Sequence, residues 1–247
     1  MDHSGYSRII PSSDKAILFI HGIAGSPSHF RNLIPVIPSD WSIRNLLLSG
    51  HGMSVKDFSR SSMAVWKSQV SAEIDNLLVQ HKRIYIVAHS MGTLFAIQEA
   101  INRPEDVSGL FLLAVPLRPR VKLSALLNCI RLTQGWVPPD HAGLIAMRDA
   151  TSIQLDRRLW KYIGWIPRFA ELLAEAGRVR KILPQLAVPA QAFQSANDEL
   201  VSPVSNKYLE RQPTVRITIL PRSGHYSYPE DELHLLQSRL IETIEKL

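Results

Sequence analysis

Cysteine is almost absent from this sequence. Cys129 is the only cysteine among 247 residues, which excludes an intramolecular disulfide and any metal cluster built on cysteines. Its position within a helical apolar pattern predicts that it packs against neighbouring side chains.

Long apolar runs are absent as well. No segment approaches the roughly 18 uninterrupted apolar residues that a membrane-spanning helix needs. The first residues lack a basic stretch followed by an apolar one, which is the pattern of a secretory signal. We therefore expect a soluble protein that is not exported and that lies in the cytoplasm. With 45% apolar residues, the chain can bury a full hydrophobic core.

Nucleic-acid-binding motifs are also missing, and aromatic residues do not alternate with basic ones, so we expect no nucleic-acid partner. The net charge of +6 is unevenly distributed. Residues 117–183 hold 12 Lys or Arg and 5 Asp or Glu, a net charge of +7, whereas the rest of the chain carries −1. A positive surface over a binding site attracts anionic substrates or an anionic membrane surface, so a peripheral membrane contact is one interpretation. The other is a solvated helical surface.

Short apolar runs alternate with amphipathic helical patterns along most of the chain. This pattern predicts strands at 16–20, 43–48, 84–88, 107–115, 190–194 and 215–220, and helices at 28–36, 62–80, 91–102 and 229–246. Parallel neighbours need crossovers long enough to hold a helix. The order therefore predicts an α/β fold with a mostly parallel central sheet and helices on both faces.

The alternation stops between Pro116 and Pro189. The segment contains two helical apolar stripes, formed by Leu123, Leu126, Leu127 and Ile130 and by Phe169, Leu172, Leu173 and Ala176. Open α/β sheets bind ligands at the carboxyl ends of their strands, and a helical insertion there would cover the site. We predict a core formed by residues 1–116 and 184–247 and a helical cap formed by residues 117–183. The aromatic cap residues Trp136, Trp160, Trp165 and Phe169 either line an acyl channel or attach the cap to the core.

The strongest chemical signal is the pentapeptide from Ala88 to Gly92, with Ser90 at its centre. It lies between an apolar strand and an amphipathic helix. A sharp turn at such a place exposes a serine hydroxyl above the sheet, and it can form only if the residues two positions before and two positions after the serine are small. Ala88 takes the place of the first glycine in this motif. The short pattern alone occurs by chance in roughly one chain in six, so the prediction of a nucleophile depends on the flanking strand and helix. The alternative is an ordinary helix-capping serine.

A serine hydroxyl is a weak nucleophile that needs a base, which a third group must orient. His225 follows the last predicted strand, in a loop that opens at the same sheet edge as Ser90, and Asp198 follows the strand before it. Glu199 is the fallback acid. The order Ser, Asp, His is the one expected for this type of turn. The alternatives are a surface-loop histidine and a helix-capping aspartate, while His89 is expected to point away from its neighbour Ser90.

Acyl transfer also needs hydrogen-bond donors for the developing oxyanion. The loop His21-Gly22-Ile23 follows the first clear strand, and Gly22 allows the backbone to turn close to a substrate. We expect the backbone amides of Ile23 and Met91 to form the oxyanion hole. His21 is interpreted as a residue that braces this loop.

Together these features resemble the α/β-hydrolase superfamily, and within it the bacterial carboxylesterases and monoacylglycerol-lipase-like serine hydrolases. The matching segments are 21–27, 50–54, 89–92, Asp198 with Val201, and Gly224-His225. The resemblance implies hydrolysis of a small ester or lipid-like substrate through an acyl-enzyme, without metal or organic cofactor. It does not extend to the cap segment, so it implies no acyl-chain length. Thr93 stands where a second glycine is common, and the chain before Lys15 is short for the family's early strands.

Other functions remain open at this point. A thioesterase, a lactonase or a C–C bond hydrolase would use the same three residues. A non-catalytic ligand-binding protein could have the same fold, since fold does not dictate function. The sequence does not indicate the oligomeric state.

Overall fold

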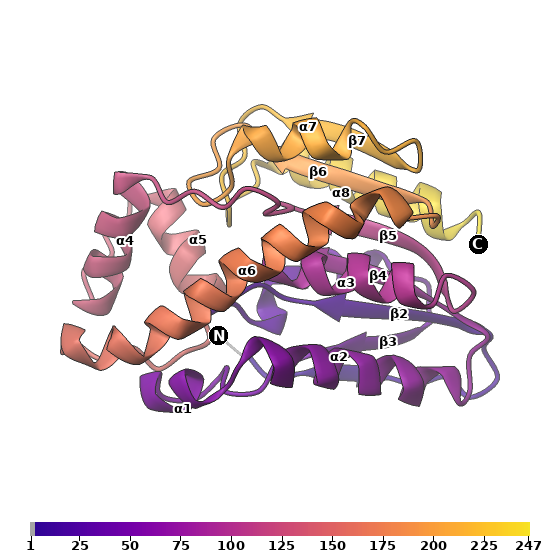
Figure 1. Cartoon of the computed structure of the whole chain (residues 1–247), viewed down its shortest axis with the longest axis horizontal. Helices are drawn as coiled ribbons and strands as arrows, with labels where there is room; N and C mark the ends of the chain where they lie inside the picture. The colour runs from indigo at the N-terminus through magenta and orange to yellow at the C-terminus, as the bar shows by residue number, and fades with distance from the viewer. Residues whose placement is uncertain (1–2) are drawn as a thin grey trace.

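The computed structural model describes residues 3–247, which form a central sheet of seven strands in the order β1-β3-β2-β4-β5-β6-β7 (Figure 1). The strands are β1 Tyr6–Arg8, β2 Lys15–Ile20, β3 Ser42–Asn45, β4 Arg83–His89, β5 Val107–Leu113, β6 Ala190–Ser195 and β7 Val215–Leu220. Neighbouring strands run parallel, except that β1 is antiparallel to β3. The mostly parallel sheet is confirmed, whereas β1 was not predicted.

Helices cover both faces of the sheet. Successive residues of a strand point to opposite faces, so Leu18 of β2 belongs to one core cluster and Ile17 to the other. The first cluster packs under α2 Met63–Leu78, α3 Met91–Asn102 and the second half of α6 Ile166–Ile182. The second packs under α8 Glu230–Ile244 and two short 3₁₀ helices, η1 Pro27–Phe30 and η2 Ile34–Val36. The smaller helices are α1 Val55–Arg60 and α7 Asn206–Leu209.

The α-helix predicted over residues 28–36 was wrong. The segment forms the two 3₁₀ helices instead, with i→i−3 bonds such as the one from the Leu33 amide to the Phe30 carbonyl, 2.9 Å long. Proline has no amide hydrogen, and it disfavours helical backbone in the residue before it. Pro35 therefore interrupts an α-helix that the spacing of apolar residues alone would favour.

The segment between β5 and β6 is helical, as predicted. It contains α4 Leu123–Thr133, α5 Ala142–Ala150, the 3₁₀ helix η3 Leu159–Trp165 and α6. Figure 1 shows α4, α5 and the beginning of α6 at one end of the sheet, while the rest of α6 runs back along the sheet. Leu132, Leu144 and Met147 form a small separate cluster between α4 and α5.

The outer side of α4 is apolar and exposed. It carries the stripe identified from the sequence, Leu123, Leu126, Leu127 and Ile130. Cys129, predicted to pack, is exposed too. Periodicity identified the helix, but the choice of the face that is buried depends on the neighbours of the helix. None of the helices within residues 3–247 is long and apolar enough to cross a membrane.

Candidate active site

Ser90 occupies the turn between β4 and α3 in a strained backbone conformation. Its φ of 52° and ψ of −123° lie where residues with a Cβ rarely occur. Its side chain makes no capping bond to α3, which argues against the role of an ordinary helix-capping serine. The turn is closed by Gly92, where an added Cβ would lie 2.3 Å from the carbonyl oxygen of Ile20. Thr93, at the position where glycine is common, donates its hydroxyl to the Ser90 carbonyl over 2.6 Å.

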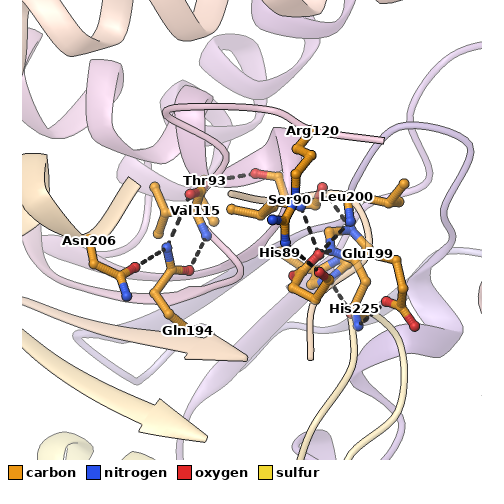
Figure 2. A network of polar contacts seen from close by, with 12 residues as sticks. His89, Ser90, Thr93, Val115, Arg120, Gln194, Glu199, Leu200, Asn206 and His225 are labelled. Carbon is orange, nitrogen blue, oxygen red and sulfur yellow. Dashed lines mark hydrogen bonds and ion pairs between the residues drawn. The ribbon is translucent and has the colours of Figure 1, made fainter. Parts of the chain in front are cut away.

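The structure brings the three predicted catalytic residues together, and Figure 2 shows Ser90 and His225 side by side. The His225 Nε2 lies 3.1 Å from the Ser90 Oγ, and the His225 Nδ1 lies 2.8 and 3.0 Å from the two carboxylate oxygens of Asp198. All three side chains are buried, and Ser90 is only 6% exposed. The carboxylate can only accept, so Nδ1 donates to it and Nε2 is free to accept the serine proton. His225 is therefore not a surface-loop histidine.

Asp198 is held by more than the histidine. Its Oδ1 accepts hydrogen bonds from the backbone amides of Leu200 and Val201 over 2.7 and 2.8 Å. These two residues lie in a loop, and the next helix, η5 Pro203–Ser205, is capped by Ser202, so Asp198 is not the helix-capping aspartate considered as an alternative. Burial by itself would raise the pKa of this carboxyl. The charge of His225 and the hydrogen bonds from its ring and from the two amides outweigh burial and lower the pKa below its ordinary value. Asp198 is thus kept ionised.

Glu199, the fallback acid, binds the backbone of His225 instead of its ring. Its carboxylate accepts from the His225 amide over 3.0 Å (Figure 2). An added Cβ on Gly224 would lie 3.2 Å from the same carboxylate, so the glycine lets Glu199 approach the loop. Two adjacent acids therefore hold one histidine, the first by its ring and the second by its main chain. The sequence contained both residues but gave no indication of this division.

His89 lies beside His225 and not against the Ser90 hydroxyl. Its Nε2 donates to the His225 carbonyl over 3.0 Å, and His29 stacks on its other side with ring centroids 3.8 Å apart. Removal from water lowers the pKa of His29 to about 3, and positive charge at His225 acts in the same direction. Burial also lowers the pKa of His89 well below its ordinary value. Both rings are neutral supports for the His225 loop, a role that sequence reasoning missed.

The predicted oxyanion loop lies directly against the elbow. An added Cβ on Gly22 would lie 2.8 Å from the Ser90 Cβ, so Gly22 contacts the serine. Ile23 is the next residue in this loop. Met91 begins α3, and the first amides of a helix have no intrahelical acceptor. The structure therefore places both predicted donor residues next to Ser90.

His21 braces this loop, as interpreted from the sequence. The Leu48 amide donates to its Nε2 over 3.1 Å, which leaves the hydrogen on Nδ1 for the Gly22 carbonyl at 2.8 Å. Burial lowers the pKa of His21 to about 4, so the ring is neutral. Ser152, from the segment between β5 and β6, donates its hydroxyl to the Gly25 carbonyl over 2.6 Å. Within residues 3–247, no group of three or more His, Cys, Asp or Glu is arranged to hold a metal ion.

Comparisons with known sequences point to one family. A model of the alpha/beta hydrolase family matches residues 17–234. The chain is 31% identical over 105 residues to a serine hydrolase-like protein of Danio rerio, over 42% of this chain and 32% of that protein. It is 29% identical over 138 residues to the probable lysophospholipase BODYGUARD 4 of Arabidopsis thaliana, over 54% of this chain and 32% of that protein. Each match spans about a third of the length of the relative.

Solved structures share the architecture at low sequence identity. The chain is similar to a structure of the metagenome-derived lipolytic enzymes LipS and LipT, with a TM-score of 0.76, 18% identity and coverage of 99% of this chain and 98% of that one. It is also similar to the monoacylglycerol lipase of Paleococcus ferrophilus, with a TM-score of 0.71, 14% identity and the same coverage. At such identities these similarities establish the fold alone.

Proposed function

The chain belongs to the alpha/beta hydrolase family, and on that basis we propose that it is a serine hydrolase that cleaves carboxylic esters. The observation that carries the proposal is the hydrogen-bonded series from Ser90 through His225 to Asp198, which begins at a strained strand-to-helix turn. A carboxylesterase or a monoacylglycerol-type lipase fits best, because solved structures of the same fold include lipolytic enzymes. The substrate is a small ester or a lipid-like molecule.

The proposed reaction has two halves. The Ser90 Oγ attacks the ester carbonyl while His225 Nε2 takes the hydroxyl proton, and the proton then passes to the departing alcohol as the C–O bond breaks. A water molecule next gives its proton to His225 and attacks the acyl-enzyme, which releases the acid and returns the proton to Ser90. Asp198 keeps Nδ1 protonated and stabilises the transient imidazolium.

Electrostatic stabilisation comes from the oxyanion hole. The backbone amides of Ile23 and Met91 hydrogen-bond to the carbonyl oxygen as it becomes negative. The loss of one such donor typically reduces the rate on the order of a hundredfold to a thousandfold. The loop of Ile23 is held by the bond from His21 to Gly22 within the core and, in this closed arrangement, by the bond from Ser152 to Gly25.

We further propose that residues 117–183 act as a cap over this site and residues 1–116 and 184–247 as the core. The cap segment begins against the acid loop, because the Arg120 amide donates to the Leu200 carbonyl over 2.7 Å and its guanidinium donates to the Asp198 carbonyl over 3.3 Å. Farther along, Ser28 Oγ donates to the Asp149 carbonyl over 2.9 Å. The near-complete burial of Ser90 fits a cap that moves when a substrate enters. A cytoplasmic location remains part of the proposal, to be tested by cell fractionation.

A series of p-nitrophenyl esters from acetate to palmitate tests the proposal. We expect a rate that peaks at one chain length and disappears in the Ser90→Ala variant. Acyl thioesters of the same chain lengths are the matched comparison. Turnover of thioesters with no turnover of oxyesters would change the assignment to a thioesterase. No turnover of either series would leave a lactonase, a C–C bond hydrolase or a ligand-binding protein of the same fold.

A further inference from the structure

Exposed apolar side chains are concentrated in the segment between β5 and β6. Within residues 3–247, twenty large apolar side chains are exposed, and twelve of them lie in residues 117–183. Leu123 is 71% exposed, Trp160 66% and Ile163 65%. Single exposed apolar residues are normal on protein surfaces, but a contiguous group marks an interaction surface. The position of these residues therefore decides whether they form such a surface.

Helix α4 contributes one side of the group. Its buried residues are Ala125 and Leu132, on the side that faces α5. The opposite side carries an apolar stripe in place of the polar residues of an ordinary surface helix. The stripe consists of Leu123, Leu126, Leu127 and Ile130.

Exposed apolar residues of η3 lie near the end of α4. At the end of α4, the Gln134 side chain donates to the Arg157 carbonyl over 3.0 Å, which brings the end of this helix next to the beginning of η3. Every residue of η3 is at least partly exposed, including Trp160 and Ile163. Trp136, in the loop just beyond the end of α4, is exposed as well. We call the exposed apolar side chains of α4, Trp136 and η3 the cap face; Figure 1 shows α4 and the beginning of α6, which follows η3, at the same end of the molecule.

Basic residues flank the cap face. Lys122 precedes the stripe, Arg131 lies over the Trp136 ring at 4.9 Å, and Arg157 adjoins the end of α4. Within the described residues none of these three forms a salt bridge, whereas the nearby Asp156 pairs with Arg158 and Lys161.

The other acidic residues of the segment pair mostly with basic residues of the same segment. Asp149, Glu171 and Glu175 are paired with arginines of the same segment, and Glu175 also pairs with Lys67 of α2. Asp140 is the one acid of residues 117–183 without a basic partner among residues 3–247. No salt bridge among residues 3–247 joins a basic residue of the segment to an acid outside it, so the rest of the chain does not offset the net charge of +7.

We propose that the cap face docks on the surface of an anionic phospholipid bilayer. Leucine, isoleucine and tryptophan side chains enter the boundary between headgroups and acyl chains, and flanking Lys and Arg residues are attracted to anionic headgroups. A second copy of the chain fits less well, because two segments of net charge +7 would face each other. The docked molecule would have the end of the sheet that carries α4 and α5 against the membrane.

Vesicle sedimentation tests this proposal. We expect the wild-type chain to bind vesicles of phosphatidylcholine with about 30 mol% phosphatidylglycerol, and to bind vesicles of phosphatidylcholine alone far more weakly, with the difference reduced by high salt. The double variants Trp160→Ser/Ile163→Ser and Lys122→Glu/Arg157→Glu should each lower the partition coefficient about tenfold or more. Val79→Ser is the matched control, because Val79 is 81% exposed but lies at the end of α2.

Two results would overturn the proposal. One is binding that does not depend on phosphatidylglycerol or is unchanged in both double variants. The other is a wild-type dimer, measured by sedimentation velocity, that the Trp160→Ser/Ile163→Ser variant converts to monomers, since the cap face would then join two copies. Trp160, Ile163, Arg157 and Val79 are exposed and Lys122 is partly exposed, so thermal melting should confirm that these variants are folded. The Ser90→Ala variant should bind vesicles as the wild type does, which separates this test from that of the proposed hydrolase activity.

Discussion

The carboxylate of Glu199 accepts a hydrogen bond from the backbone amide of His225 over 3.0 Å. The neighbouring carboxylate of Asp198 binds the ring of the same histidine. The two acids are adjacent in sequence and differ in which part of His225 they hold. Their substitution should therefore have different consequences for the proposed reaction.

Asp198→Asn should lower kcat by about three to four orders of magnitude, because the amide no longer fixes the Nδ1–H tautomer or stabilises the imidazolium. Glu199→Ala should lower kcat by roughly tenfold with little change in KM, because His225 loses one backbone support and samples unproductive positions. Steady-state kinetics on the best ester measures both effects. Glu199→Gln keeps an acceptor oxygen for the amide and should restore most of the activity. If Glu199→Gln were as impaired as Asp198→Asn, the carboxylate would take part in the reaction directly.

Thr93→Val should destabilise the elbow. The substitution keeps the shape of the side chain but removes the hydroxyl that donates to the Ser90 carbonyl. The loss of one such buried hydrogen bond is worth about 1 kcal/mol, which corresponds to a decrease of roughly 2–4 °C in Tm for a chain of this size. Thermal unfolding followed by circular dichroism measures the shift. Thr93→Ser retains the hydroxyl and should melt closer to the wild type, and equal melting of Val and Ser variants would show that the bond contributes nothing.

Stability should fall as the pH decreases from 6.5 towards 4. The pKa of His21 is lowered by burial from 6.5 to about 4, and that of His29 to about 3. Between these values and pH 6.5 the two histidines bind protons in the unfolded chain but stay neutral in the folded one, so acid favours unfolding. Each contributes up to about 1.4 kcal/mol per pH unit in this window and nothing above pH 7.

His29→Phe is the matched variant for this pH dependence. It retains a ring to stack on His89 and removes one proton-binding site, and the Nε2 that it eliminates is buried without a hydrogen-bond partner among residues 3–247. Urea unfolding at pH 7 and pH 5 should therefore give a smaller loss of stability for the variant, by about 2 kcal/mol. An equal loss in both proteins would contradict a neutral, buried His29.

The parts of the molecule that sequence predicted well depend on local chemistry. The turn at Ser90 requires a small residue at position 92, because a larger side chain there would clash with the Ile20 carbonyl. The turn itself causes this clash, so the requirement is visible in the sequence. Asp198 and His225 could be chosen because carboxyl ends of parallel strands meet at one sheet edge, and the structure brings both to Ser90. The predicted core and cap boundaries stay a prediction.

The parts that sequence could not predict depend on contacts between distant residues. The stacking of His29 on His89 joins residues 60 positions apart that share no pattern. Strand β1 has only three residues, and none of them is buried. It therefore has no apolar run from which a strand could be predicted. The stripe on α4 has ordinary helical periodicity, and nothing in it distinguishes a face that packs against the core from one that is exposed.

Active-site labelling tests the central proposal most directly. The native protein should react with a fluorophosphonate at one site per chain, and tandem mass spectrometry should locate the adduct on Ser90. Heat-denatured protein and Ser90→Ala should remain unlabelled, and His225→Ala should react on the order of a thousandfold more slowly, because the serine depends on its base. Failure of the native protein to react, or an adduct that persists in Ser90→Ala, would contradict the proposal that Ser90 is an activated nucleophile.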